Sequence, residues 1–190
     1  KKNPQWVHFG AGNIFRAFPA ALQQKLLNEG IEKTGIIVAE GYDYEIIKKA
    51  YRPQDDLSLL VTLKANGTIE KTVIGSLAES LTVDRHDAAD WNRLKEIFAS
   101  NTLQMVSFTI TEKGYSITSP DGAFRADVKA DFEAGPENAD SYIGKLAALC
   151  YWRYTQGAAP LALVSMDNCS HNGDKLFAAV DAYAKAWTEN

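Results

Sequence analysis

The sequence predicts an α/β fold built on an open, mainly parallel β-sheet. Short apolar segments with strand character alternate along the chain with segments that place apolar residues at helical spacing. Residues 36–39 form a continuous, mostly β-branched apolar run, as expected for a strand that is covered on both faces. This alternation is typical of strand–helix–strand units with right-handed crossovers, which build a doubly wound sheet.

The first such unit spans residues 6–39. Residues 6–9 form the first predicted strand, and a helical segment runs from the following turn to Glu29, with Gly30 as a C-terminal signal. Pro19 lies inside this segment, where it removes one backbone N–H and predicts a kink. Residues 36–39 form the second strand.

An inserted β-hairpin interrupts the alternation. Residues 57–63 and 68–74 have strand character and flank Asn66-Gly67, a pair that strongly favours a tight hairpin turn. The sequon Asn66-Gly67-Thr68 is therefore interpreted as part of this turn and not as a glycosylation site.

The rest of the chain returns to the α/β pattern, with no internal repeat or linker, so residues 1–190 are interpreted as one domain. The predicted elements are a helix capped by Asp87 and reaching Phe98, a strand at 105–111, a polar segment with turns at 114–140, a helix capped by Asp140 or Ser141 and ending before Gly157, a strand at 161–164, and a helix carrying Leu176, Val180, Tyr183 and Trp187.

The composition excludes several classes of protein. The 190 residues carry 20 basic and 24 acidic side chains, with no basic block, which argues against nucleic-acid binding. No stretch approaches the roughly 18 apolar residues of a membrane span, and no signal peptide is visible. Two cysteines and three histidines without metal-ligand spacing predict neither a disulfide scaffold nor a zinc site. We therefore expect a cytoplasmic protein without metal, nucleic-acid or membrane partners.

A glycine-rich turn joins the first strand to the first helix. Gly10 permits a tight turn, and Gly12 allows the backbone to approach phosphate groups near the helix start. The third position of the G-x-G-x-x-G pattern is Phe15, which predicts looser helix–strand packing or a ring that shapes the site. The turn indicates dinucleotide binding, and a plain tight turn is the alternative.

An acidic residue ends the second strand. Glu40 stands where this kind of fold places a carboxylate that accepts from the adenosine ribose hydroxyls. The same charge would repel a 2′-phosphate, which favours NAD over NADP. Asp43 is the alternative ribose ligand, and a solvated carboxylate with no ligand is the alternative structural interpretation.

Two later segments are rich in polar groups directly after predicted strands. They are residues 109–115 and residues 165–173. Because open α/β sheets bind ligands at the carboxyl ends of their strands, both segments are candidates for a ligand site. For the second segment, a helix start capped by Asn172 is the alternative.

Three segments together resemble the N-terminal domain of the mannitol dehydrogenase family of polyol-specific long-chain dehydrogenases, which includes fructuronate and tagaturonate reductases. They are Gly-Ala-Gly-Asn-Ile-Phe-Arg-Ala-Phe at 10–18, Thr-Glu-Lys-Gly-Tyr at 111–115 and Asp-Asn-x-x-His-Asn-Gly at 167–173. The resemblance covers essentially the whole chain. It implies a Rossmann-type domain that binds NAD, and metal-independent hydride transfer between NAD(H) and a secondary alcohol carbon.

The resemblance also implies roles for individual residues. Asn168 matches an asparagine that stabilises the substrate oxygen. The sequence departs from the family at Phe15, where a histidine is common, and at Ser170, where a proline is common. The implied cofactor-binding residues are Gly10, Gly12, Asn13, Phe15, Arg16, Glu40, Thr111 and Glu112.

The family's general base is absent from these 190 residues. It is the lysine of a Lys-x-x-x-x-Asn-x-x-His motif in a helical C-terminal domain, and no lysine here has that context. We therefore expect the NAD-binding portion of a longer two-domain enzyme that interconverts a polyol or aldonate with its keto-sugar or keto-uronate. The alternative is a non-catalytic NAD-binding module that senses redox state.

Overall fold

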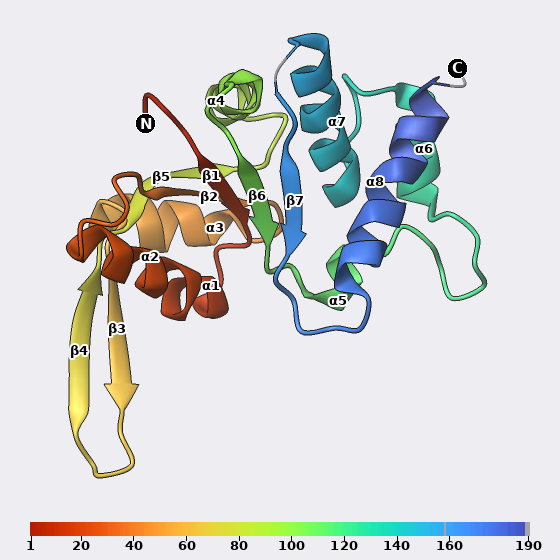
Figure 1. Ribbon diagram of the computed structural model, residues 1–190. Coiled ribbons are helices and arrows are strands. Elements are labelled where there is room, and N and C mark those ends of the chain that lie inside the picture. The colour runs from red at the N-terminus through yellow and green to blue at the C-terminus, as the bar shows by residue number, and fades with distance from the viewer. Residues whose placement is uncertain (158, 189–190) are drawn as a thin grey trace.

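A parallel β-sheet of five strands forms the centre of the molecule (Figure 1). The computed structural model describes residues 1–157 and 159–188. The strands are β1 (Trp6–Phe9), β2 (Ile36–Glu40), β5 (Leu77–Thr82), β6 (Met105–Phe108) and β7 (Ala162–Ser165). Their order across the sheet is β5-β2-β1-β6-β7, and every neighbouring pair is parallel. The predicted α/β class is confirmed.

Helices cover both faces of this sheet. One face carries α1 (Asn13–Ala17), α2 (Pro19–Asn28), α3 (Tyr44–Ile46), a π-helical turn (Ile47–Tyr51) and a 3-10 turn (Arg52–Gln54). The other face carries α4 (Ala88–Ala99), α7 (Tyr142–Thr155) and α8 (Asn172–Thr188). Because successive residues of a strand point to opposite faces, β2 buries Ile36 and Val38 on one side and Ile37 and Ala39 on the other.

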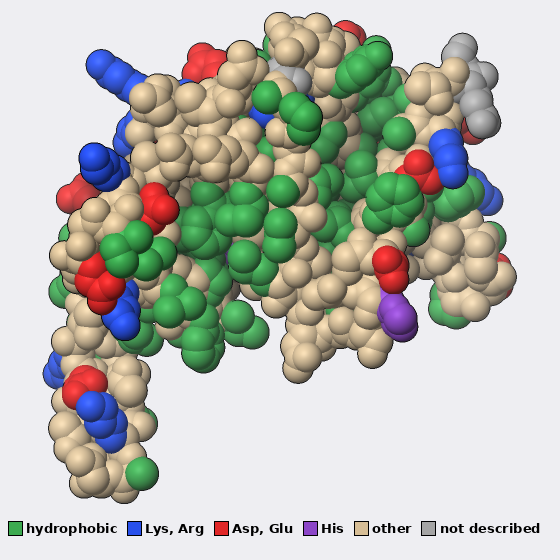
Figure 2. All heavy atoms as spheres, viewed as in Figure 1, with side chains coloured by type: hydrophobic (Ala, Val, Ile, Leu, Met, Phe, Trp, Pro, Cys, Tyr) green, Lys and Arg blue, Asp and Glu red, His purple; other side chains and the backbone are tan. Residues whose placement is uncertain are grey.

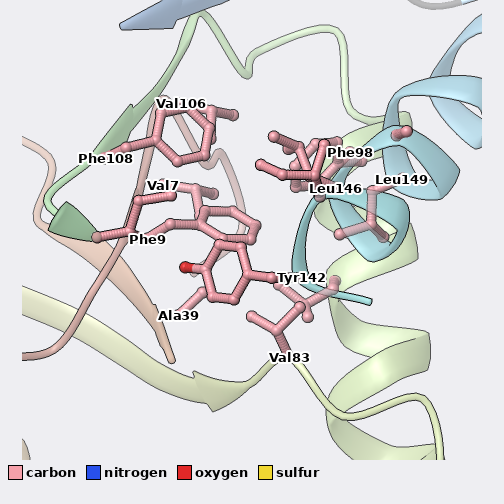
Figure 3. Close-up of a cluster of buried hydrophobic side chains, with 14 of the residues drawn as sticks. Val7, Phe9, Ala39, Val83, Phe98, Val106, Phe108, Tyr142, Leu146 and Leu149 are labelled. Atoms are coloured by element: carbon pink, nitrogen blue, oxygen red, sulfur yellow. The ribbon is translucent and has the colours of Figure 1, made fainter. Parts of the chain in front are cut away.

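The larger of the two cores lies between the sheet and helices α4 and α7 (Figure 3). Each of its central side chains is completely removed from solvent, which contributes about 1.5–3 kcal/mol per side chain to folding. These residues are Val7, Phe9, Val106 and Phe108 from the strands, Phe98 from α4, and Leu146 and Leu149 from α7.

The predicted hairpin is present and separate from the main sheet. It consists of β3 (Ser58–Leu63) and β4 (Ile69–Ile74), paired antiparallel in register Leu63↔Ile69. Gly67 has a φ of 81°, which a residue with a side chain adopts only at a cost. Figure 1 shows the hairpin extending away from the rest of the molecule as an arm.

Pro19 divides the first predicted helix in two. α1 ends at Ala17, and α2 begins at Pro19, where the missing N–H costs nothing because the first helical N–H has no intrahelical partner. The predicted kink is confirmed.

Three elements differ from the predictions. Strand β5 was not predicted, because Leu77–Thr82 mixes polar and apolar residues; Ser80 and Thr82 are nevertheless buried and bonded to Asp56 and Asp90. The strand predicted at 105–111 ends at Phe108, and the short helix α5 (Thr111–Gly114) follows. The polar segment at 114–140 contains a helix, α6 (Ala126–Ala134).

Among residues 1–157 and 159–188, no helix is long and apolar enough to cross a membrane.

Candidate functional site at the carboxyl ends of the strands

Gly10 and Gly12 play different parts in the turn after β1. Gly10 has a φ of 111°, and a Cβ added to it would overlap the carbonyl oxygen of Thr109. Only glycine therefore allows β1 and the segment after β6 to come so close. A Cβ added to Gly12 would meet nothing within 4 Å, so the space above this residue is open to a ligand.

The turn also presents backbone donors that the described part of the chain does not use. The N–H of Gly10 donates to Ala39, and that of Ala11 donates to Glu40. The N–H groups of Gly12, Asn13 and Ile14 have no partner among the described residues. Three free donors beside an open glycine match the needs of an anionic group such as a pyrophosphate.

Asn13 and Arg16 lie together on α1, next to this turn. The Arg16 guanidinium donates to the Asn13 side chain at 2.5 Å and lies 5.7 Å from the centre of the Tyr51 ring. Both residues line a hollow of about 640 Å³ between α1 and the hairpin arm. A fixed positive charge is thus held at the edge of the open turn.

Phe15 does not line the site. Its side chain is completely buried and stacks on the His8 ring, with centroids 4.2 Å apart and planes within 11°. The expectation of loose helix packing or of a ring that shapes the site is wrong, because the ring fills the space between α1 and the sheet. A cofactor contact through the Phe15 backbone stays a prediction.

Glu40 is bound to backbone amides and is not a free carboxylate at a strand end. One oxygen accepts from Ala11 at 2.8 Å, and the other accepts from Gly41, Tyr42 and Asp43. The residue is 8% exposed. Glu40 therefore joins the glycine turn to the end of β2, while the oxygen facing Ala11 retains capacity for a second donor. The alternative ligand, Asp43, is exposed beside it.

A pocket next to Glu40 was not predicted from the sequence. Its volume is about 210 Å³, and Gly41, Tyr42 and Tyr142 are among the residues that line it. The Tyr42 and Tyr142 rings are stacked at 4.7 Å, and a Cβ on Gly41 would overlap the Tyr142 ring. The buried Tyr142 hydroxyl has no partner among the described residues, and Figure 3 shows it pointing away from α7. Burial raises the pKa of this hydroxyl, which stays protonated.

Asp167 connects the segments that follow β6 and β7. Its carboxylate accepts from the backbone of Ile110 at 2.9 Å and Thr111 at 3.0 Å, and from the Tyr115 hydroxyl at 2.5 Å. Thr111 has a φ of 66°, which is unusual for a β-branched residue and marks local strain. The three contacts hold this strained segment in place.

Asn168 and Glu112 are exposed on either side of this connection. The Asn168 side chain has no hydrogen bond within the described residues and is available to a ligand. Glu112 forms an ion pair with Lys175 of α8. Asn172 begins α8, and its side chain donates to the carbonyl of Asp167 at 2.9 Å. The predicted helix start at Asn172 is therefore present, and it also holds the Asp167–Asn168 segment.

Parallel strands bring the predicted residues to one edge. The glycine turn, Glu40, Thr111 and Asn168 follow β1, β2, β6 and β7, whose carboxyl ends meet along the same side of the sheet.

Comparison with known proteins agrees with this architecture. A family model described as the mannitol dehydrogenase Rossmann domain matches residues 4–190. The chain belongs to this family. As a mannitol dehydrogenase Rossmann domain it is similar to a D-mannonate oxidoreductase from Thermotoga maritima, with 48% identity over 190 residues, and to a polyol:NADP oxidoreductase from Gluconobacter oxydans, with 32% identity over 188 residues.

A solved structure of the same family has the same fold. The mannitol 2-dehydrogenase of Pseudomonas fluorescens, in a ternary complex with NAD and D-mannitol, matches 98% of the chain with a TM-score of 0.82 and 29% identity. The chain spans 35% of the length of the Thermotoga protein, 38% of the Gluconobacter protein and 38% of the Pseudomonas chain.

Proposed function

We propose that residues 1–190 form the NAD-binding N-terminal portion of a longer two-domain oxidoreductase. The observation that carries the proposal is the open glycine turn with three unpaired N–H groups, held next to Glu40 and Asn168 at one sheet edge. The limited share of each relative that the chain spans supports a second domain. The unpaired cysteines, Cys150 and Cys169, support a reducing compartment such as the cytoplasm.

We infer that the dinucleotide lies across the strand ends with its pyrophosphate at Gly12 and the Arg16 side chain nearby. The adenosine half belongs on the β2 side, where Glu40 and Asp43 are both acidic and would repel a 2′-phosphate, which favours NAD over NADP. The nicotinamide half belongs on the side of β6 and β7, next to Thr111, Glu112 and Asn168.

The substrate class follows from the relatives. We infer an open-chain sugar alcohol or aldonate and its keto form, with the mannonate/fructuronate pair favoured over mannitol/fructose and altronate/tagaturonate by the 48% identity to the Thermotoga protein. NAD, when bound, supplies the hydride acceptor. Asn168 would donate a hydrogen bond to the substrate oxygen, where negative charge develops during the reaction. The lysine that takes the hydroxyl proton is expected in the second domain.

The test uses both the 190-residue chain and the longer protein. We expect the longer protein to oxidise NADH with fructuronate, and more slowly with tagaturonate or fructose. The 190-residue chain should bind NAD without turnover, since the base and most of the substrate pocket are absent. Asn168→Ala in the longer protein should lower kcat by about a hundredfold or more and leave NAD affinity nearly unchanged.

Asn66→Ala in the hairpin turn is the matched control and should leave kcat unchanged. Turnover by the 190-residue chain at the rate of the longer protein would contradict the proposal, because a base would then lie within these residues. If the longer protein binds NAD but turns over none of the sugars, the redox-sensing alternative is favoured.

A further inference from the structure

A line of hydrogen-bonded side chains runs under the glycine turn, between β1 and β6. The Trp6 indole N–H donates to the Ser107 hydroxyl at 2.6 Å. The Ser107 hydroxyl lies 2.7 Å from Nδ1 of His8, and Nε2 of His8 lies 2.9 Å from the Thr109 hydroxyl. His8 and Ser107 are completely buried, and the Phe15 ring covers the imidazole. Trp6, His8 and Ser107 have no role in the site described above, where Thr109 contributes only its carbonyl oxygen next to Gly10.

The chemistry of Ser107 sets the direction of this line. Its hydroxyl has two polar side chains within hydrogen-bond distance, Trp6 and His8. An indole N–H only donates, so the single proton of Ser107 has one acceptor available, which is Nδ1 of His8. The opposite arrangement would leave a completely buried O–H without a partner, at a large cost.

The protonation of His8 determines which atom donates in its hydrogen bond with Thr109. Burial lowers the pKa of His8 to about 3, so the ring is neutral at physiological pH and carries one proton. Since Nδ1 accepts from Ser107, the proton is on Nε2 and is donated to the oxygen of Thr109. The Thr109 hydroxyl proton then has no acceptor among the described residues.

Thr109 directly follows β6 and borders the glycine turn. Its hydroxyl oxygen would lie 3.1 Å from a Cβ built on Gly10, and its side chain is only partly buried. In the sheet, β6 lies on the side of β1 opposite to β2. Because Glu40 assigns the adenosine half to the β2 side, Thr109 faces the other half of the dinucleotide.

We propose that the Thr109 hydroxyl donates a hydrogen bond to an oxygen of the nicotinamide-side ribose, and that Ser107 and His8 are positioning residues that hold it as a donor. The inference rests on the proposed function, since it requires NAD at this turn. The proposal also assigns a role to the buried histidine. If the His8 proton were on Nδ1, Nε2 would accept the Thr109 hydroxyl proton, and only oxygen lone pairs of Thr109 would face the ligand.

Binding measurements on the 190-residue chain test the contact. Thr109→Val keeps the branched shape and removes the hydroxyl, so NAD affinity should fall by about three- to tenfold, as for the loss of one hydrogen bond. Thr109→Ser restores the donor and should bind NAD within about twofold of the wild type. ADP lacks the nicotinamide-side ribose, so its affinity should be the same in all three proteins. Thr62→Val on the hairpin arm is the control and should bind both ligands normally.

Nuclear magnetic resonance tests the direction independently of affinity. The ¹⁵N spectrum of His8 at neutral pH should show a protonated Nε2 and an unprotonated Nδ1. Hydrogen bonds in a chain polarise one another, so the Nε2 proton resonance should shift when NAD binds and stay in place when ADP binds. If His8 had only a structural role, its Nε2 proton resonance would show no difference between NAD and ADP.

Each opposing result has a separate meaning. A proton on Nδ1, unchanged NAD affinity of Thr109→Val, or an equal loss of NAD and ADP affinity overturns the inference and leaves the proposed function standing. Absence of NAD binding by the wild-type chain overturns the proposed function, and the inference with it.

Discussion

Glu40 connects two parts of the site through a single carboxylate. It accepts from the glycine turn at Ala11 and from three successive amides after β2. Hydrogen bonds to a charged group contribute more than neutral ones, and losing a buried acceptor leaves its donors unpaired. Glu40 therefore shapes the turn in addition to any contact with the ribose.

Replacing Glu40 should affect binding and stability together. We expect Glu40→Ala to weaken NAD binding by about ten- to a hundredfold and to lower the free energy of unfolding by about 2–4 kcal/mol, because four amides lose their acceptor. Calorimetric titration with NAD and NADP and denaturant unfolding measure the two effects. Asp43→Ala is the control, and a loss of NAD affinity there with none at Glu40→Ala would transfer the ribose contact to Asp43.

Helix α6 shows how one side chain can join three elements. Asp131 is 4% exposed and accepts from the backbone of Asp140 and Ser141, just before α7, and from the Tyr183 hydroxyl of α8. Trp187 of α8 donates to its carbonyl oxygen. Ser141 in turn caps α7 by accepting from the N–H of Gly144. The packing of α6, α7 and α8 thus depends on a buried acid.

Removing this acid should destabilise the domain. We expect Asp131→Ala to lower the free energy of unfolding by about 3 kcal/mol, since several buried donors lose their partner. Glu133→Ala, on the exposed side of the same helix, should change it by less than about 0.5 kcal/mol. Urea unfolding followed by circular dichroism gives both values, and equal effects would contradict a joining role for Asp131.

On the face seen in Figure 2, apolar side chains gather over α1 and α2 and between β7 and α8. The hairpin arm adds a further apolar surface. One face of the arm carries Leu59, Val61 and Leu63 of β3 opposite Val73, Lys71 and Ile69 of β4, and the apolar members of this set are 46–74% exposed. Within the described part of the chain, no further strand pairs with either edge of this two-stranded sheet. Such a surface favours association with another protein surface.

The 190-residue chain should therefore self-associate in a concentration-dependent way. We expect Leu63→Lys, which places a charge on the apolar face of the arm, to reduce this association by at least about tenfold in dissociation constant. Thr62→Lys adds the same charge to the opposite face and should leave association unchanged. Sedimentation velocity at several concentrations measures it. Equal behaviour of the two variants would exclude the arm and point to the surfaces of α1, α2, β7 and α8.

Local chemistry was sufficient to predict several elements. Asn66-Gly67 predicted the hairpin, Pro19 predicted the break between α1 and α2, and the apolar run at 36–39 predicted a strand buried on both faces. The glycine turn and the polar segments after β6 and β7 were also placed at one edge in advance. Each of these signals acts through neighbouring residues or through the strand period, so it is readable along the chain.

Other features depended on partners distant in the sequence. Glu40 was predicted to bind the cofactor ribose, with a solvated carboxylate as the alternative; the structure adds a hydrogen bond from an amide 29 residues away, which the sequence did not indicate. Phe15 was expected at the ligand, yet it is packed on His8. Strand β5 was missed because its polar residues find acceptors only in the folded protein. Helix α6 was missed because Asp131 stabilises it through partners that are distant in the sequence, such as Tyr183. Composition and spacing thus determined the class and the turn of this protein, and the resemblance of three segments to a known family indicated its family. Only the tertiary structure decided which polar groups are satisfied and which remain free for a ligand, because a hydrogen bond depends on distance in space and not along the chain.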